Sequence, residues 1–518
     1  MTETPENIRK QVEERVAQEG AIPGDGSDKP EITSEFIQDC LRANELGDGT
    51  LYAAEFRNRF LYCKNSQEWF EWAGHCWQRD IMNHSLAAVE KIVDHYLTEC
   101  KAVATKIVDL TASGEDEKVG QLRTTQSNLL KRVSQLRADK RRTACLKFAH
   151  TIENPIAISG EEFDQHPMLF PCANGVIDLE TGLLNPGRPG DYLSLASPVA
   201  FSGIDTPAPI WERSLLEIFN RNEDMVAYLQ RLFGYAMTAS VQEKIFPVLY
   251  GRTGWNGRSL IVETISYCMG ALAGSIPSEM LLSQKYGKSS SGPSPDIMSL
   301  KGIRLAFASE IDEGQRFSAA KIKWLTGRDE LTGRSPHDKY PTRFKPTHKL
   351  MVMTNSQPQA PPNDKAFWER LHLIPFTISF VNREPQESYE RRAIVNLDQQ
   401  VLQEASGILA WMVRGCLHWQ KEGLKPPRAI TEATEQYRRD EDLLADFIDE
   451  CCITEPGAKE KAAAIYTRFA DWYQANVGKK VPTGTWFGKQ LSQKYEKNKV
   501  EGCVTYHGIM LNGEGNPV

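Results

Sequence analysis

Short apolar segments alternate with helical patterns across residues 216–385 of the chain. Three of these segments read as strands, Phe246–Tyr250, Arg304–Ala308 and Lys349–Thr354, and polar residues follow each of them. Alternation of this kind predicts an α/β domain built on a parallel sheet. In such folds ligands bind outside the carboxyl ends of the strands. We therefore expect a nucleotide crevice beside the polar residues that follow the three strands.

The hydrophobic pattern divides the rest of the chain into four further regions. They are residues 1–45, a polar leader expected to be partly disordered; 46–215, a mainly helical domain ending in a β connector; 386–445, a helical linker; and 446–518, two helices followed by a β-like tail. The last region has helical patterns at 465–476 and 486–497 ahead of strand-like residues 504–511. Two helices followed by a hairpin suggest a winged-helix module.

Three stretches of the region 46–215 carry structural signals. The aromatic segment Trp69–Trp77 reads as a small hairpin, and the glycine-flanked segment Asn174–Gly182 reads as a short β connector. Residues 115–147 are charged and place apolar side chains at helical spacing. A helical hairpin arm and a solvated helix packed on its own domain both fit this stretch, and the second is the simpler expectation.

Composition excludes several classes of protein. Of the 518 residues, 41% are hydrophobic and 25% are charged, as in an ordinary soluble globular protein. No stretch approaches the roughly 20 apolar residues that span a bilayer, so no membrane partner is expected. The 11 cysteines include no C-x-x-C pair, which argues against a zinc ribbon. Because the net charge is −7, any binding of nucleic acid must depend on local basic clusters.

The segment that follows the first strand is rich in glycine and opens a predicted helix. It runs Gly251-Arg-Thr-Gly-Trp-Asn-Gly-Arg-Ser259 and is a variant of the phosphate-binding loop G-x-x-x-x-G-K-[ST]. Arg258 stands at the lysine position, and Gly251 lies one residue too far upstream. Backbone N–H groups of such loops converge on phosphate oxygens, and the helix N-terminus adds a positive dipole. The loop therefore predicts a nucleoside triphosphate site, made by Gly251, Gly254, Asn256, Gly257, Arg258 and Ser259.

Polar residues after the other strands complete the predicted chemistry. Glu310 ends the second strand, where a carboxylate can hold Mg²⁺ or orient an attacking water, and Asp312 and Glu313 follow closely enough to share these roles. Asn355 ends the third strand, where its amide can sense the γ-phosphate. Arg370 precedes a further apolar segment. Periodicity alone does not decide whether it is a surface arginine or one that stabilises transition-state charge.

The order of these motifs resembles a known pattern. The loop at 251–259, Glu310, Asn355 and Arg370 resemble the A, B, C and arginine-finger motifs of superfamily 3 helicases. More closely, the chain resembles the helicase part of the phage and plasmid primase–helicase family, which is related to the poxvirus primase–helicase. Further stretches share the likeness: Asn174–Gly182, Phe233–Tyr235, Lys323–Asp329, Phe344–Leu350 and Asp364–Arg370.

The resemblance implies a fold and an activity. The fold is an AAA+-like P-loop ATPase domain at 216–385, flanked by a mainly helical N-terminal domain and a C-terminal winged-helix module. The activity is that of an ATP-dependent DNA helicase, a homo-hexameric ring on single-stranded and forked DNA that replicates a phage, plasmid or integrated mobile element. ATP and Mg²⁺ are the implied cofactors. Their implied ligands are Ser259 and Glu310 for Mg²⁺, Glu310 or Glu313 for the attacking water, Asn355 for the γ-phosphate and Arg370 from the neighbouring subunit.

The resemblance also bears on partners and location. Many relatives begin with a primase domain, whereas about 45 polar residues precede the matched region here. We therefore expect a primase on a separate chain, together with host replication proteins. The family implies the cytoplasm of a bacterial host cell.

Two sets of residues are predicted to contact DNA. The family's hairpin between motifs B and C projects DNA-gripping residues into the ring, and the turn at 335–341 suits its tip. Lys339 would contact phosphate, and His337 and Tyr340 would contact sugar or base; a proline-bounded surface loop is the alternative. Separately, residues 459–499 hold nine basic and three acidic residues, a local net charge of +6. Such a cluster is typical of phosphate binding, and it includes Lys489, Lys494 and Lys497.

The sequence leaves three functions open. The first is the ATP-driven replicative helicase. The second is an ATP-gated ring with weak or no hydrolysis, serving origin recognition or as a replication scaffold, because Arg258 could bind triphosphate while slowing its hydrolysis. The third is a DNA-binding regulator whose ATPase fold is only structural.

Overall fold

The computed structural model describes residues 31–283, 294–309, 311, 315–336, 340–362, 364–441, 443–478, 481–500 and 503–512. Five predicted site residues lie outside these ranges, as does most of the predicted leader: Glu310, Asp312, Glu313, His337 and Lys339. The chain forms two compact units, Met1–Gln165 with Gly187–Ser194 and His166–Pro186 with Leu195–Val518.

The first unit combines helices with one small sheet. Its helices are α2 (Ser34–Arg42), α3 (Asn44–Phe56), α4 (His84–Ala87), α5 (Val89–Ser113), α6 (Asp116–Leu136) and α7 (Asp139–Ala149). Its sheet has the order β3-β2-β1-β4, from β1 (Phe60–Cys63), β2 (Glu68–Trp72), β3 (Trp77–Arg79) and β4 (Ala157–Ile158). The predicted aromatic hairpin is confirmed, because β2 and β3 pair antiparallel with Trp72 opposite Trp77.

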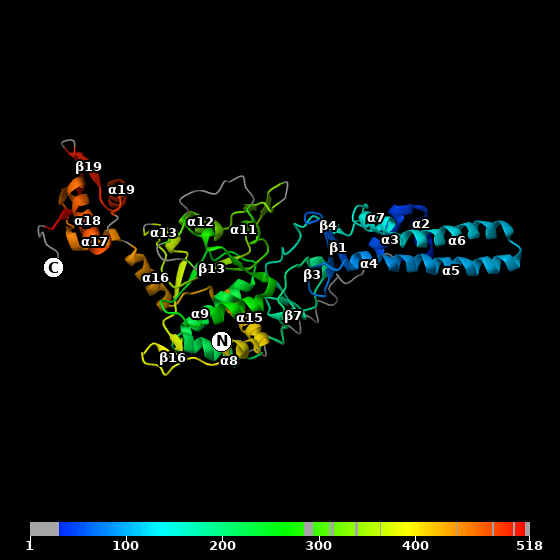
Figure 1. Ribbon diagram of the computed structural model, residues 1–518, viewed down its shortest axis with the longest axis horizontal. Helices are drawn as coiled ribbons and strands as arrows, with labels where there is room; N and C mark the ends of the chain where they lie inside the picture. The colour runs from blue at the N-terminus through cyan, green and yellow to red at the C-terminus, as the bar shows by residue number, and fades with distance from the viewer. Residues whose placement is uncertain are drawn as a thin grey trace. The chain divides into compact units, whose positions relative to one another are not determined.

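Helices α5 and α6 form a long hairpin (Figure 1). Gly114 joins them in the left-handed region, at φ 77°, which glycine adopts without strain. At the base of the hairpin Leu129, Val133 and Leu136 of α6 enter the core of the unit. The sequence alternative of a helical hairpin is therefore the observed one, rather than a single packed helix. Helix α5 provides the apolar surface against which α6 packs.

The second unit is built around a five-stranded sheet of order β14-β8-β13-β10-β9. Its strands are β8 (Phe246–Tyr250), β9 (Ala273–Ile276), β10 (Leu305–Ser309), β13 (Lys349–Thr354) and β14 (Leu371–Pro375), and all neighbours pair in parallel. The predicted parallel sheet is confirmed. Two of the three predicted strands have the observed bounds, and the third is shifted by one residue.

Both faces of this sheet are buried. Along β10, Leu305 and Phe307 belong to one apolar cluster, while Ala306 and Ala308 belong to another. Successive side chains of a strand point to opposite faces, so a sheet covered on both sides needs continuous apolar runs. This is why the central strands were visible in the sequence.

Helices cover the two faces and lead the chain between the strands (Figure 1). They are α8 (Pro209–Ile218), α9 (Glu223–Met237), α10 (Arg258–Met269), α11 (Pro295–Met298), α12 (Ala319–Leu325), α13 (Lys365–Trp368), α14 (Leu397–Leu402), α15 (Ala405–Glu422) and α16 (Arg428–Asp440). Small sheets complete the unit: β5 (Leu169–Cys172), β6 (Gly175–Asp178) and β7 (Leu183–Asn185); β11 (Leu331–Gly333) with β12 (Thr342–Phe344); and β15 (Ser379–Val381) with β16 (Glu390–Arg392).

Helices α9 and α15 pack at close range through glycine. A Cβ added at Gly234 would lie 2.1 Å from the backbone nitrogen of Cys416, in the facing helix. We expect Gly234→Ala to lower the free energy of unfolding by about 3 kcal/mol, because neither backbone can yield without repacking the core. Gly120→Ala is the control. Gly120 lies within α6 with nothing near its added Cβ, so this change should stabilise the chain by about 0.5–1 kcal/mol. Urea unfolding of the intact chain measures both, and equal stabilities for the two variants would contradict the packing described here.

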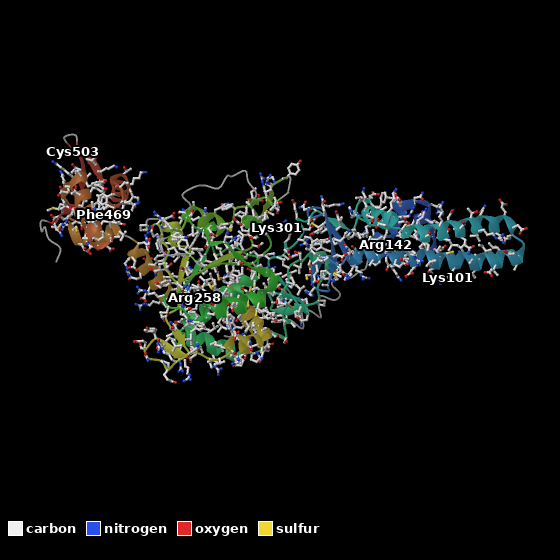
Figure 2. All side chains as sticks on the ribbon, viewed as in Figure 1. Lys101, Arg142, Arg258, Lys301, Phe469 and Cys503 are labelled. Atoms are coloured by element: carbon white, nitrogen blue, oxygen red, sulfur yellow. The ribbon has the colours of Figure 1, made fainter. Side chains whose placement is uncertain are left out.

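The C-terminal residues form a small module with its own core. It contains α17 (Leu443–Cys451), α18 (Ala462–Asn476) and α19 (Gly484–Lys494), a sheet of β18 (Lys459–Lys461), β20 (Cys503–His507) and β19 (Lys497–Val500), and the pair β17 (Cys452–Ile453) with β21 (Met510–Leu511). Phe447, Phe469 and Phe487 meet at its centre (Figure 2 labels Phe469). The last predicted helix ends three residues early, so Lys497 lies in a strand.

Candidate functional site

The glycine-rich loop at 251–257 joins the carboxyl end of β8 to the N-terminus of α10. Gly257 caps α10 with φ 87°, and a Cβ there would lie 2.6 Å from Ile218. A side chain is thus excluded twice, by backbone conformation and by space. The first N–H groups of a helix have no partner within the helix, and the aligned peptide dipoles make this end positive. The loop therefore presents a site suited to an anion.

Strand β15 holds the outer part of the loop. The backbone N–H of Phe380 donates to the carbonyl of Trp255 over 2.7 Å, and the hydroxyl of Ser379 donates to the carbonyl of Gly254 over 3.3 Å. Trp255 itself has φ 58° and a side chain 82% exposed. Left-handed backbone is rare for a bulky residue, and such strain is most often found at functional sites.

Asn256 braces the loop from inside. Its side chain is buried, with Nδ2 donating to the carbonyl of Thr253 over 2.7 Å. Its Oδ1 accepts from Nε of Arg258 over 3.0 Å. A Cβ on Gly251 would lie 2.0 Å from the same amide, which explains glycine at the start of the loop. Asn256 therefore shapes the loop, and its amide is turned away from solvent.

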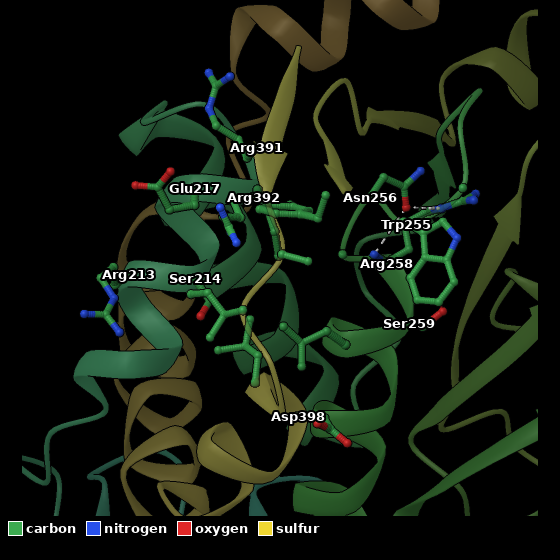
Figure 3. A pocket seen from close by; sticks show the side chains of 18 of the residues that line it. Arg213, Ser214, Glu217, Trp255, Asn256, Arg258, Ser259, Arg391, Arg392 and Asp398 are labelled. Atoms are coloured by element: carbon green, nitrogen blue, oxygen red, sulfur yellow. Dashed lines mark hydrogen bonds between the residues drawn. The ribbon is translucent and has the colours of Figure 1, made fainter. Parts of the chain in front are cut away.

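The guanidinium of Arg258 is buried against the ends of two strands (Figure 3). Its Nη1 donates to the carbonyls of Leu249, over 3.2 Å, and of Thr354, and its Nη2 donates to Oδ1 of Asn355. Burial lowers the pKa of Arg258 below its ordinary value, although an arginine with so high a pKa stays charged. Arg258 thus ties β8 to β13, where the lysine of a phosphate-binding loop would be a mobile charge.

The ends of three strands come together at this edge of the sheet. Asn355 follows β13 directly, and the next residue, Ser356, donates its hydroxyl to the carbonyl of Ile311 over 3.2 Å. Ile311 follows β10 and is next in sequence to Glu310. The parallel arrangement thus brings Asn355 beside the loop and Ile311 beside the residues that follow β13.

A cavity of about 800 Å³ opens beside the loop (Figure 3). Its apolar lining includes Ile218, Phe380, Ile394 and Leu397, from α8, β15 and the segment leading into α14. Cavities of this size and lining hold small molecules and cofactors. Because the loop residues Gly254–Leu260 form another wall, a ligand in the cavity can reach the N-terminus of α10.

Arginines form part of the rim of this cavity, which Glu217 and Asp398 also line, and Arg392 is paired with Glu384. Figure 3 shows Arg213, Arg391 and Arg392 on one side of it, with Arg258 and Ser259 across from them. The sequence did not predict this side of the cavity, because no motif indicates that α8 and the residues before α14 lie together. The adjacent pair Arg391-Arg392 was the one available signal.

Arg370 lies at the other end of the strands, on the side of the sheet where β8 and β14 begin. It immediately precedes β14, and its carbonyl accepts from the N–H of Phe246, the first residue of β8. The five residues of β8, at roughly 3.3 Å each, separate this end from the loop by about 15 Å. Its Nη1 donates to the carbonyl of Ala366, and its buried Nε has no partner among the described residues. Arg370 therefore does not contact the loop of its own chain.

The residues predicted to contact DNA lie in two other places. The strand-like pieces around 335–341 are confirmed as β11 and β12, an antiparallel pair, and Tyr340 between them is 79% exposed. Lys489 and Lys494 are exposed on α19, and Lys497 is exposed on β19. The described members of the predicted site thus form four separate groups: the loop with Asn355, Arg370, Tyr340, and the three lysines of the C-terminal module.

Comparison with known proteins finds similarity to viral proteins that are named as helicases and primases. Residues 49–220 match the family model described as "D5 N terminal like". A protein of Acanthamoeba polyphaga mimivirus named "Putative helicase" is 25% identical over 443 residues, which are 82% of this chain and 45% of that protein. A protein of African swine fever virus named "Putative primase" is 23% identical over 362 residues, 66% of this chain and 36% of that protein. The chain therefore spans less than half the length of these relatives.

A solved structure, the C-terminal region of NrS-1, matches 61% of this chain and 77% of its own at 12% identity, with a TM-score of 0.35, which is too low to carry an argument. These relatives come from viruses of eukaryotes, so they do not support the bacterial host that the family resemblance implied. In the part of the chain that the structure describes, no helix is long and apolar enough to cross a membrane.

Proposed function

We propose that this chain, which belongs to the primase–helicase family of DNA replication proteins, is an ATP-dependent DNA helicase that acts as a homo-hexameric ring on single-stranded and forked DNA. One observation carries the proposal. The glycine-rich loop, the ends of β8, β10 and β13, and a cavity of about 800 Å³ meet at one edge of a parallel sheet.

The shape and charge of this edge fit ATP. The base and ribose would occupy the apolar side of the cavity, and the phosphates would lie at the N-terminus of α10, facing the arginine rim. Ser259 is exposed in the first turn of α10, where its hydroxyl can bind Mg²⁺ together with Glu310. Glu310 or Glu313 would orient the attacking water, and Asn355 would sense the γ-phosphate. The strand order, with β8 flanked by β13 and β14, supports the assignment of an AAA+-like P-loop ATPase.

The position of Arg370 supports action between subunits. An arginine about 15 Å from the loop of its own chain would act on a nucleotide only at the site of a neighbour. Partial use of its hydrogen-bonding groups within the chain leaves the guanidinium able to bind a neighbour's γ-phosphate. We assign it the arginine-finger role.

DNA would be bound by two elements. The first is the β11–β12 hairpin, where Tyr340 is exposed and where His337 and Lys339 would join it in contacting DNA. The second is the C-terminal module, whose three helices and three-stranded sheet support a winged-helix assignment.

The charge cluster of the C-terminal module leads to a prediction. Replacing Lys489, Lys494 and Lys497 together by alanine should weaken duplex DNA binding and lower the slope of log Kd against log salt by up to about 3, since each phosphate contact contributes about 0.9. The control replaces Lys101, Lys106 and Lys118, three lysines of the α5–α6 hairpin, and should leave the slope unchanged. Fluorescence anisotropy over a salt series measures both. Equal slopes in the triple variant and the native chain would remove DNA binding from this module.

The ATP-gated ring with weak or no hydrolysis remains a second candidate. It is favoured by the hydrogen bond that the guanidinium of Arg258 donates to Asn355. Because Arg258 and Asn355 bind each other, neither is free for the role that it would have in hydrolysis. Both candidates require ATP binding by the intact chain. Isothermal titration with a non-hydrolysable ATP analogue and Mg²⁺ should give a Kd in the range of about 1 μM to 1 mM. Absence of binding would exclude both candidates and favour the third function, a DNA-binding regulator whose ATPase fold is only structural.

A further inference from the structure

The first unit contains a cavity of its own, which the proposed function does not use. It has a volume of about 420 Å³ and lies between α2, the start of α3, α6 and α7. Four cationic side chains line it, Arg42, Lys131, Arg132 and Arg141, and no carboxylate does. The rest of the lining is almost entirely amide and hydroxyl side chains, with a single leucine.

Helix α6 is built to present this lining. Asn128, Arg132 and Gln135 recur at spacings of three and four residues, so they share one face of the helix, which is turned to the cavity. Leu129 and Val133 lie on another face and enter the core of the unit. The helix therefore has an apolar face that packs in the core and a polar, basic face that lines the cavity.

The positive charge at the cavity is not fully compensated. Arg42 is paired with Asp39, and Arg132 and Arg141 share one carboxylate, that of Asp48, at 2.6 and 2.8 Å. Asp48 is fully buried and also accepts from the hydroxyl of Tyr96. Nε of Arg132 and Nη2 of Arg141 are buried without a partner among the described residues. Lys131 adds an exposed charge at the rim.

Such a surplus of cations with spare donors requires an anion. Arginine pairs and lysine bind phosphate through charge-assisted hydrogen bonds. The amide side chains of Asn128 and Gln135 offer both donors and acceptors, which match the edges of nucleic-acid bases, whereas the Nε2 of Gln38 donates to Glu99. A cavity of this volume lies at the lower end of the range for small ligands.

We propose that the cavity between α2, α6 and α7 binds the phosphate group of a nucleotide, with its amides contacting the sugar or base. The nucleotide belongs either to a single strand of DNA or to the free pool, and both sources present the same phosphate chemistry. The site lies wholly in the first unit and does not depend on ATP hydrolysis, so its failure would leave the proposed helicase activity untouched.

The test compares two variants of the full chain with equal charge change. The cavity variant combines Lys131→Glu with Asn128→Asp, both exposed on α6 and outside the hydrogen bonds that hold Arg132. The control combines Lys101→Glu with Gln121→Glu, exposed on the same hairpin but not lining the cavity (Figure 2 labels Lys101). Lys131→Ala is a milder cavity variant. Thermal unfolding establishes that each remains folded.

Hydrogen–deuterium exchange of α2 and α6 is measured with thymidine 5′-monophosphate, with a ten-residue thymidine oligonucleotide and with inorganic phosphate. We expect slower exchange in the native chain and the control, and at least tenfold weaker binding in the cavity variant. Protection by the oligonucleotide alone assigns a DNA strand, and protection by the mononucleotide as well assigns a free nucleotide. No protection, protection by inorganic phosphate alone, or equal protection in both variants would overturn the proposal.

Discussion

Replacing Arg370 by alanine is expected to reduce DNA-stimulated ATP hydrolysis by about 10³-fold or more, because an arginine finger stabilises the charge of the transferring phosphoryl group. Binding of ATP should change little, since Arg370 lies at the far edge of the sheet from the loop of its own chain. The fold should persist as well. The one hydrogen bond lost, from Nη1 to the carbonyl of Ala366, is worth about 1 kcal/mol.

A mixing experiment tests whether Arg370 acts between subunits. Arg370→Ala is combined with a loop variant, Ser259→Ala, that retains its own finger. If the finger serves the neighbouring site, rings of both variants regain part of the activity that each lacks alone. Arg370→Lys is the matched control, because it keeps the charge and loses the planar fork. No recovery on mixing, with both variants shown to co-assemble, would place Arg370 in a structural role.

Changing Arg258 to lysine is expected to raise the turnover of ATP by about tenfold, equivalent to about 1.4 kcal/mol of the barrier. A lysine keeps the charge but cannot reach the carbonyls of Leu249 and Thr354 and the amide of Asn355 together, as the guanidinium does. It therefore releases Asn355 for the γ-phosphate and can itself move to the phosphates.

Arg258→Ala separates this effect from loss of the bridge between strands. Without a guanidinium, buried acceptors at the ends of β8 and β13 lose a charged donor, so we expect a loss of about 3 kcal/mol in unfolding free energy, together with weaker ATP binding. Urea unfolding and single-turnover hydrolysis, measured side by side on the three proteins, distinguish the outcomes. Lower turnover in Arg258→Lys than in the native chain would mean that the arginine contacts the triphosphate directly.

The sheet could be predicted from the sequence because burial on both faces leaves a visible trace. β8 is a continuous apolar run and β13 has four consecutive apolar residues between Lys349 and Thr354, and the observed bounds of both are those of the predicted strands. The meeting of the loop with Asn355 followed from parallel pairing alone. Local chemistry also located Gly257, since a motif position that caps a helix with positive φ needs glycine.

The rest of the site depends on contacts between residues far apart in the chain. Arg258 donates to Asn355 across 97 positions, and no periodicity encodes that choice of partner. The cavity is closed by Ile218 and Leu397, which lie on either side of the whole sheet in sequence. The last helix was predicted too long because Lys494–Lys497 continue a helical pattern, whereas Tyr495 adopts extended backbone and the pairing with β20 starts at Lys497.

Steady-state ATP hydrolysis by the purified chain, with and without single-stranded DNA, tests the central claim most directly. If the chain is an ATP-driven helicase, we expect Mg²⁺-dependent turnover that DNA stimulates and that Arg370→Ala abolishes. Binding of ATP with no turnover in either condition would contradict it, and recovery of turnover in Arg258→Lys would then identify a ring that uses ATP as a clamp.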